Sequence, residues 1–78
     1  MDERIAAARI EGRIDLLREQ RADINAALNA VQEELEIARA NAESEHDYHV
    51  YAWTRRVVKK ERLIAEIDSQ IRKLTERS

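Results

Sequence analysis

Residues 10–42, IEGRIDLLREQRADINAALNAVQEELEIARANA, decide the fold of this chain. Apolar residues recur here at alternating spacings of four and three, which is the heptad pattern of a coiled coil. The series is Ile10, Ile14, Leu17, Arg21, Ile24, Leu28, Val31, Leu35, Ala38 and Ala42. Only Arg21 breaks it, so the stretch predicts a long amphipathic helix with one apolar seam.

The second half of the chain carries a matching seam. It runs through Val50, Trp53, Val57, Lys60, Ile64, Ile67, Ile71 and Leu74, and Lys60 is its one break. We interpret Arg21 and Lys60 as snorkelling side chains that help to set the register. The predicted seam core is therefore Ile14, Leu17, Ile24, Leu28, Val31, Leu35, Trp53, Val57, Ile64, Ile67, Ile71 and Leu74.

Composition favours helices throughout. The chain has 78 residues, no proline, no phenylalanine, no cysteine and a single glycine, Gly12, and 38% of its residues are charged. Long helices have this composition, whereas sheets depend on aromatic residues and on glycine or proline turns. The missing cysteines exclude disulfides and thiolate metal sites, and one glycine excludes a glycine-rich phosphate loop. We expect one small domain, 1–78, with a thin core.

The two seams differ in phase, which indicates a turn between them. Asn41 is expected to leave the first helix in the left-handed conformation. Ser44, with Asp47 three residues later, matches a capping box at the start of the second helix. The predicted fold is an all-α, antiparallel two-helix coiled-coil hairpin, with arm one at about 3–42, the turn at about 42–45 and arm two at about 45–77. The alternative is one long continuous helix in a coiled coil, with a local stutter at the phase change.

Two registers satisfy the seams of a hairpin. Folding the chain about Ser44 places Leu35 opposite Trp53, and a longer loop places Ala42 opposite Trp53 instead. The sequence does not choose between them.

Charge is distributed unevenly along the chain. Residues 22–48 carry seven acids against Arg39, and residues 49–78 carry eight bases against four acids, although the whole chain has a net charge of only −2. We expect the basic arm to lie along the acidic arm. Phosphate binding by the basic run at 55–62 is the alternative, and nucleic acid is not the expected partner.

Some apolar and aromatic residues lie outside the seam. They are Leu16, Ile37, Val58 and Leu63, together with Tyr48 and Tyr51. An apolar face wider than a two-stranded seam is typical of helices that pack in bundles. We therefore expect these residues to form an interface that completes the hairpin, as a homo-oligomer or as a subunit bound to another protein in a larger assembly.

The segment 43–49, ESEHDYH, is the one cluster whose residue types could bind a metal or take part in catalysis. Glu43 with His46, and His46 with His49, have the spacing of metal ligands on one helix face, so a metal-binding helical bundle is one alternative. A polar hairpin tip with capping carboxylates explains the same residues. We assign no catalytic residue, no metal ligand and no cofactor, since no serine or threonine has histidine and aspartate partners at a meaningful spacing.

The segment also gives a family resemblance. Ala38-Arg39 before the tip, Asp47-Tyr48-His49 after it, and Gly12 with Leu16 are similar to the N-terminal hairpin of Gre-type transcript cleavage factors. The resemblance implies an acidic tip that enters the secondary channel of RNA polymerase and helps to hold magnesium. The family's Gly-Asp-Leu-x-Glu-Asn-Ala tip is missing here.

The chain shows neither a secretory signal nor an apolar run long enough to span a membrane. We expect a cytoplasmic protein, or one incorporated in a soluble assembly, with no membrane partner. The function that the sequence favours is a non-enzymatic protein–protein interaction or assembly module: a small structural, adaptor or assembly-chaperone protein, such as phages and mobile elements encode.

Overall fold

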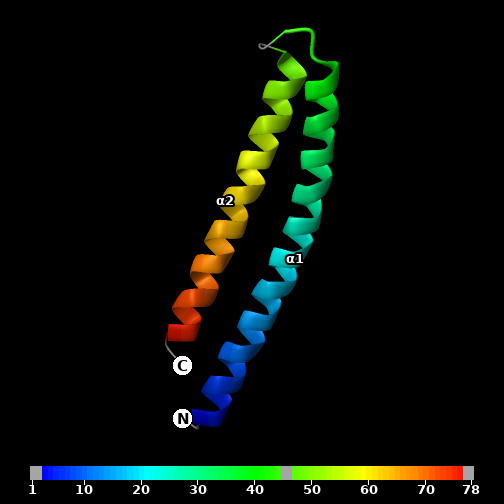
Figure 1. The fold of residues 1–78 in the computed structure, drawn as a ribbon. Coiled ribbons are helices and arrows are strands. Elements are labelled where there is room, and N and C mark those ends of the chain that lie inside the picture. The colour runs from blue at the N-terminus through cyan, green and yellow to red at the C-terminus, as the bar shows by residue number, and fades with distance from the viewer. Residues whose placement is uncertain (1–2, 45–46, 77–78) are drawn as a thin grey trace.

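The computed structural model describes residues 3–44 and 47–76 of the chain. They form two helices, α1 (Glu3–Asn41, 39 residues) and α2 (Tyr48–Glu76, 29 residues), which run antiparallel along one another (Figure 1). The hairpin is a rod with extents of 63 × 16 × 12 Å. The prediction of an all-α helical hairpin is confirmed, and the continuous-helix alternative is excluded.

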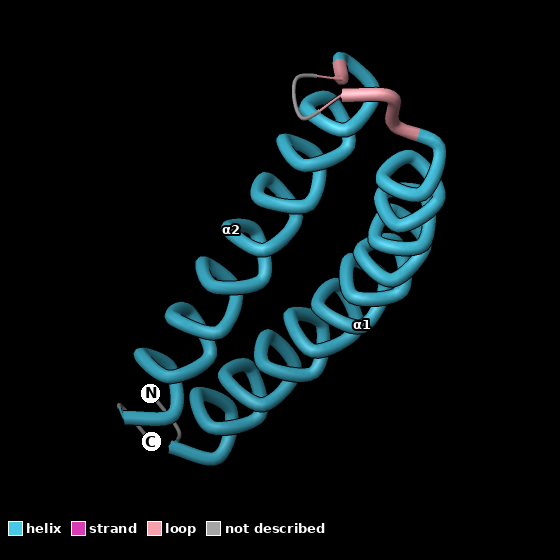
Figure 2. Tube along the Cα trace, turned by 45° about the horizontal axis from the view of Figure 1, so that its top comes forward, coloured by secondary structure: helices cyan, strands magenta, loops and turns pink. Residues whose placement is uncertain are grey.

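The connection between the helices departs from its predicted form. Figure 2 shows the short loop that joins α1 to α2 at one end of the rod. The backbone N–H of Ala42 donates to the carbonyl of Arg39 at 3.3 Å, so a tightened last turn ends α1. No described residue has a positive φ, and Asn41 is still helical. The predicted left-handed Asn41 is therefore wrong, because the shorter hydrogen bond already satisfies a carbonyl at the helix end.

The helices pack along the predicted seam. Every residue of the predicted seam core is buried or half-buried. The most buried are Leu17, Leu28 and Leu35 of α1 and Val57 and Ile67 of α2. Leu28, Leu35 and Val57 form one cluster, and Val31, Val50, Trp53 and Ile64 pack against it. The core is thus a single line of side chains between two helices, densest in the half of the rod near the loop.

An ion pair between the helices indicates the register. Nε of Arg21 donates to Oδ1 of Asp68 at 2.6 Å. In the register folded about Ser44, Arg21 lies opposite Ile67, which is adjacent to Asp68. The longer loop would place Arg21 opposite Leu74, about 9 Å further along the helix. The ion pair therefore favours the register folded about Ser44.

α1 is the longer helix and continues past the end of α2 (Figure 1). Ile5, in the first turns of α1, is half exposed to solvent. Within the described residues, neither helix contains a segment that is long and apolar enough to cross a membrane.

We expect Leu35→Ala to lower the free energy of unfolding by about 2–3 kcal/mol, because it removes a large side chain from the centre of the seam. Leu35 is only 7% exposed, whereas Leu16 on the same helix is 54% exposed. Leu16→Ala is the matched control and should change the stability of the monomer by less than about 0.5 kcal/mol. Urea unfolding followed by circular dichroism at low protein concentration measures both, and equal effects would contradict the seam described here.

Candidate functional site

The hairpin tip holds the cluster of residues that could bind a metal or take part in catalysis. In the structure, Asp47 of this cluster has a structural role. Its Oδ1 accepts hydrogen bonds from the backbone N–H groups of His49, at 2.8 Å, and Val50, at 3.4 Å. Its carbonyl accepts the N–H of Tyr51 at 3.1 Å, the first bond of the helical ladder. Asp47 is therefore the N-cap of α2, in the usual arrangement for an aspartate before a helix.

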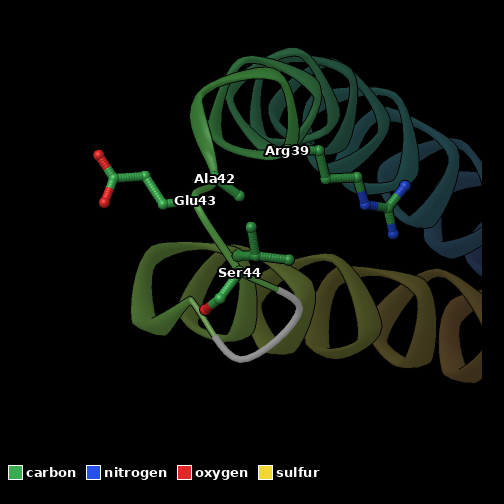
Figure 3. A pocket seen from close by; sticks show the side chains of 5 residues that line it. Arg39, Ala42, Glu43 and Ser44 are labelled. Carbon is green, nitrogen blue, oxygen red and sulfur yellow. The ribbon is translucent and has the colours of Figure 1, made fainter.

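This cap corrects the prediction for the tip. Ser44 was expected to cap the second helix, but α2 begins at Tyr48, three residues later than about 45. Ser44 lies in the loop instead, beside a hollow of about 400 Å³ that Arg39, Ala42, Glu43 and Val50 also line (Figure 3). The Glu43 carboxylate points away from the Arg39 guanidinium in this view.

The histidines of the tip do not assemble a metal site in the described part of the chain. His49 is exposed, and its ring lies edge-on to the ring of Tyr48 with centroids 6.0 Å apart. No group of three histidine, aspartate or glutamate side chains among residues 3–44 and 47–76 is arranged to hold a metal ion. His46, which both predicted ligand pairs share, lies outside those ranges, as does Glu45.

The aromatic residues of α2 divide between core and surface. Trp53 packs against the cluster of Leu28, Leu35 and Val57. Tyr48 and Tyr51 are 75% and 60% exposed. Trp53 is thus part of the seam near the tip, whereas the two tyrosines present their rings to solvent.

Basic side chains cover the surface of α2 that follows these aromatic residues. The guanidinium of Arg56 lies over the Trp53 ring, 4.4 Å from its centroid, and that of Arg55 lies 5.8 Å from the centroid of Tyr51. Such cation–π contacts at exposed sites contribute about 0.5–1 kcal/mol each. Both arginines use aromatic rings of their own helix rather than acids of α1.

The charges of the two arms do not pair as the sequence suggested. Glu33, Glu34 and Glu36 are exposed on α1, and none of them forms an ion pair with a described base. The ion pair that joins the helices has its base, Arg21, on α1 and its acid, Asp68, on α2, the reverse of the predicted polarity. Glu34 and Glu36 line hollows beside the seam, with Trp53 and with Val57 respectively. They stay unpaired because Arg55 and Arg56, the arginines in this part of α2, lie over the rings of Tyr51 and Trp53 instead.

The predicted interface residues are all exposed. The exposed fraction ranges from 37% for Leu63 to 75% for Tyr48, and Leu16, Ile37, Val58 and Tyr51 lie between these values. Ile37 lines a hollow with Ala38, Trp53 and His49, so that side of α1 adjoins the side of α2 that carries His49. Leu63 follows His49 by fourteen residues, or two heptads, and therefore lies on the same side.

Two exposed surfaces result. We call the first the side face; it comprises Leu16, Ile37 and Leu63. The second lies on the outside of α2, where Tyr51, Thr54, Arg55, Arg56, Val58, Lys59 and Arg62 line one shallow hollow of about 820 Å³. Sequence reasoning named the apolar members of both surfaces but did not separate them, because that requires knowing which flanks of the two helices adjoin.

Comparison with known proteins finds no matching family model, no matching curated protein and no matching solved structure.

We expect Asp47→Ala to lower the free energy of unfolding by about 1 kcal/mol, because it removes the acceptor of the second and third amides of α2, those of His49 and Val50. Asp47→Asn should retain most of the stability, since asparagine is an equally good cap. Ser44→Ala is the control and should have little effect. Thermal and urea unfolding of the three variants measure this, and a larger loss for Ser44→Ala than for Asp47→Ala would restore the capping box.

Proposed function

We propose that this chain is a non-enzymatic protein–protein interaction module that acts through apolar side chains outside its helical seam. One observation carries the proposal: among the described residues, more large apolar or aromatic side chains are exposed than are buried. Those exposed are Ile5, Leu16, Ile37, Tyr48, Tyr51, Val58 and Leu63, against five buried core residues.

The energetics favour a covering partner. Fully burying a leucine, isoleucine or valine side chain contributes about 1.5–3 kcal/mol. Small domains have a total stability of only about 5 kcal/mol, and a single two-helix seam is near the lower limit of what folds alone. Leu16, Ile37 and Leu63 are already about half buried, so covering the side face would add about 2–4 kcal/mol, a large fraction of the stability of the hairpin itself.

The side face has the geometry of a helix-packing surface. Leu16 and Ile37 occupy the same heptad position three heptads apart, so they lie along one line of α1 about 31 Å long. Asp23 and Ala30 occupy the same position between them, so the line is apolar at both ends and at Ala30 and carries one acid. Leu63 lies on the adjoining flank of α2, so a partner helix on this face would contact both arms, as in a four-helix bundle. A structural, adaptor or assembly-chaperone role in a soluble assembly, of the phage or mobile-element kind, would use such a face.

The two chemical alternatives have less support. A tip that regulates RNA polymerase would need several carboxylates available to a metal ion. Asp47 already caps α2, which leaves Glu43 as the one carboxylate of the described tip that is not engaged. A metal-binding bundle would need converging ligands, and no described residues converge in this way. No observation favours either alternative over helix packing.

We expect Leu16→Glu combined with Leu63→Glu to abolish association while the hairpin stays helical, because both side chains lie outside the seam. Gln20→Glu combined with Gln70→Glu is the matched control: both glutamines are exposed on the same flanks and gain the same charge without loss of an apolar group. Sedimentation velocity over a concentration series, with circular dichroism of each sample, gives the readout. A wild-type chain that sediments as a monomer and retains nothing from an extract of its source cells would contradict the proposal.

A further inference from the structure

The outer surface of α2 carries a line of positive charge that nothing in the described chain neutralises. Arg55, Lys59 and Arg62 are spaced at i, i+4 and i+7, so they share one ridge, and Val58 lies beside them in the same hollow. We call these four residues the basic strip. None of its three cations forms an ion pair with a described carboxylate, and like charges at this spacing repel one another.

The outer surface of α1 carries the opposite charge. Glu33 and Glu36 are exposed beside Ile37, which is 54% exposed. Asp23 extends the same surface toward the N-terminus and is also exposed. We call these four residues the acidic ridge; Ile37 is the residue that it shares with the side face, which borders it. None of its three acids pairs with a described base.

The two surfaces cannot meet within one chain. At 100° per residue, Glu33 lies opposite the seam residues of α1, and Arg55 lies opposite those of α2. The middle of each surface therefore points away from the partner helix, although Ile37 and Glu36, on the two flanks of the ridge, also line hollows beside α2. Charge complementarity between them can be satisfied only between separate molecules.

We propose that the basic strip is the docking site for the acidic ridge of a second copy of this chain, packed antiparallel. The proposal rests on the proposed function and identifies one partner for it. When Ile37 of one copy is level with Val58 of the other, Glu36 comes level with Lys59 and Glu33 comes level with Arg62. One aliphatic pair and two opposite-charge pairs are thus brought level in a single alignment.

The match extends along the helices in the same alignment. Ala30 comes level with Ala65, and Ala26 with Ser69, so small side chains allow the helices to approach closely. Asp23 then comes level with Arg72, which makes a third opposite-charge pair. The complementarity ends at Glu19, which would lie level with Glu76.

The opposite orientation offers a smaller match. With Ile37 level with Val58 but the helices parallel, Glu33 comes level with Thr54, and Ala40 with Glu61. A parallel shift by five more residues brings Glu33 level with Lys59 and Glu36 level with Arg62, but it replaces Val58 by Leu63 and places Asp23 level with His49. It therefore lacks the third opposite-charge pair. We expect the antiparallel arrangement, which repeats between molecules the arrangement of α1 and α2 within one.

The surfaces also determine how the assembly grows. Because the basic strip and the acidic ridge lie on opposite edges of the hairpin, each copy offers one surface to one neighbour and the second surface to another. Such a head-to-tail contact extends into rings or filaments instead of stopping at a dimer. A protein is a better partner for the basic strip than a nucleic acid is. Val58 is exposed among the cations, where an apolar side chain could cover it, and the acids of α1 near the tip would repel phosphates.

The test is a charge swap. Lys59→Glu with Arg62→Glu makes the basic strip acidic, and Glu33→Lys with Glu36→Lys makes the acidic ridge basic. Each double variant alone should associate at least about tenfold more weakly than wild type, because two attractive pairs become repulsive. An equimolar mixture of the two should recover association, since the acidic strip of one variant then meets the basic ridge of the other. Sedimentation equilibrium at about 50 mM salt, where charges are weakly screened, measures each case.

Controls separate this proposal from the general one. Arg9→Glu with Arg13→Glu changes net charge as much as the strip variant does, on an exposed part of α1 outside both surfaces, and should leave association unchanged. Circular dichroism checks folding, because glutamate, lysine and arginine have similar helix propensities. If both charge variants associate like wild type while Leu63→Glu does not, the docking proposal fails and the interaction module stands.

Two further outcomes would overturn the docking proposal. One is a wild-type chain that stays monomeric at low salt. The other is an equimolar mixture of the variants that does not recover association. If a monomeric wild type binds a random-sequence RNA oligonucleotide and the strip variant does not, the occupant of the strip is a polyanion and the second copy is excluded.

Discussion

The apolar seam between α1 and α2 is the interaction on which the rest of the structure depends. It is a single line of side chains, and even its most buried members retain 6–8% of their accessible surface. Two helices cannot enclose a residue from all sides, so every seam side chain has solvent on at least one flank. This limit affects the rest of the chain. Because the core provides little stability, the helix cap at the loop and any contact made by the outer surfaces matter more than they would in a larger domain.

The sequence predicted the seam well because heptad spacing is a direct consequence of helix geometry. Arg21 and Lys60 were named as exceptions, and both are half-buried in the structure, with the Arg21 head group reaching out to Asp68. The register was harder, since shifting one helical arm by seven residues leaves every heptad position in place. An ion pair one residue away from the seam distinguishes the two registers, and a pattern of apolar spacings carries no such information.

The tip was predicted less well, for a related reason. Ser44 and Asp47 are both good N-cap residues, and the sequence contains a capping-box spacing that ends at the true cap. The choice between them depends on how many residues the chain needs to cross from α1 to α2. That distance is a property of the packed hairpin, so no local motif reveals it. The charge pairing was predicted poorly for the same reason. The sequence shows that the two arms carry opposite charges, but it does not show which side of each helix faces the other helix.

The positions of the surface charges bear on whether the hairpin is stabilised within one chain or between chains. A solitary helical hairpin would gain stability from opposite charges placed beside the seam, where they could pair across it. Arg21 and Asp68 do pair in this way, but Asp23 and Glu33 lie on the outer side of α1, and Arg55, Lys59 and Arg62 line the outer hollow of α2. Repulsion within each line is a small cost to each helix, and pairing within the chain does not offset it. Such a distribution does little for the isolated molecule. Under the docking proposal it would orient a neighbouring helix, so the feature that weakens the hairpin alone would specify how it packs with a second copy.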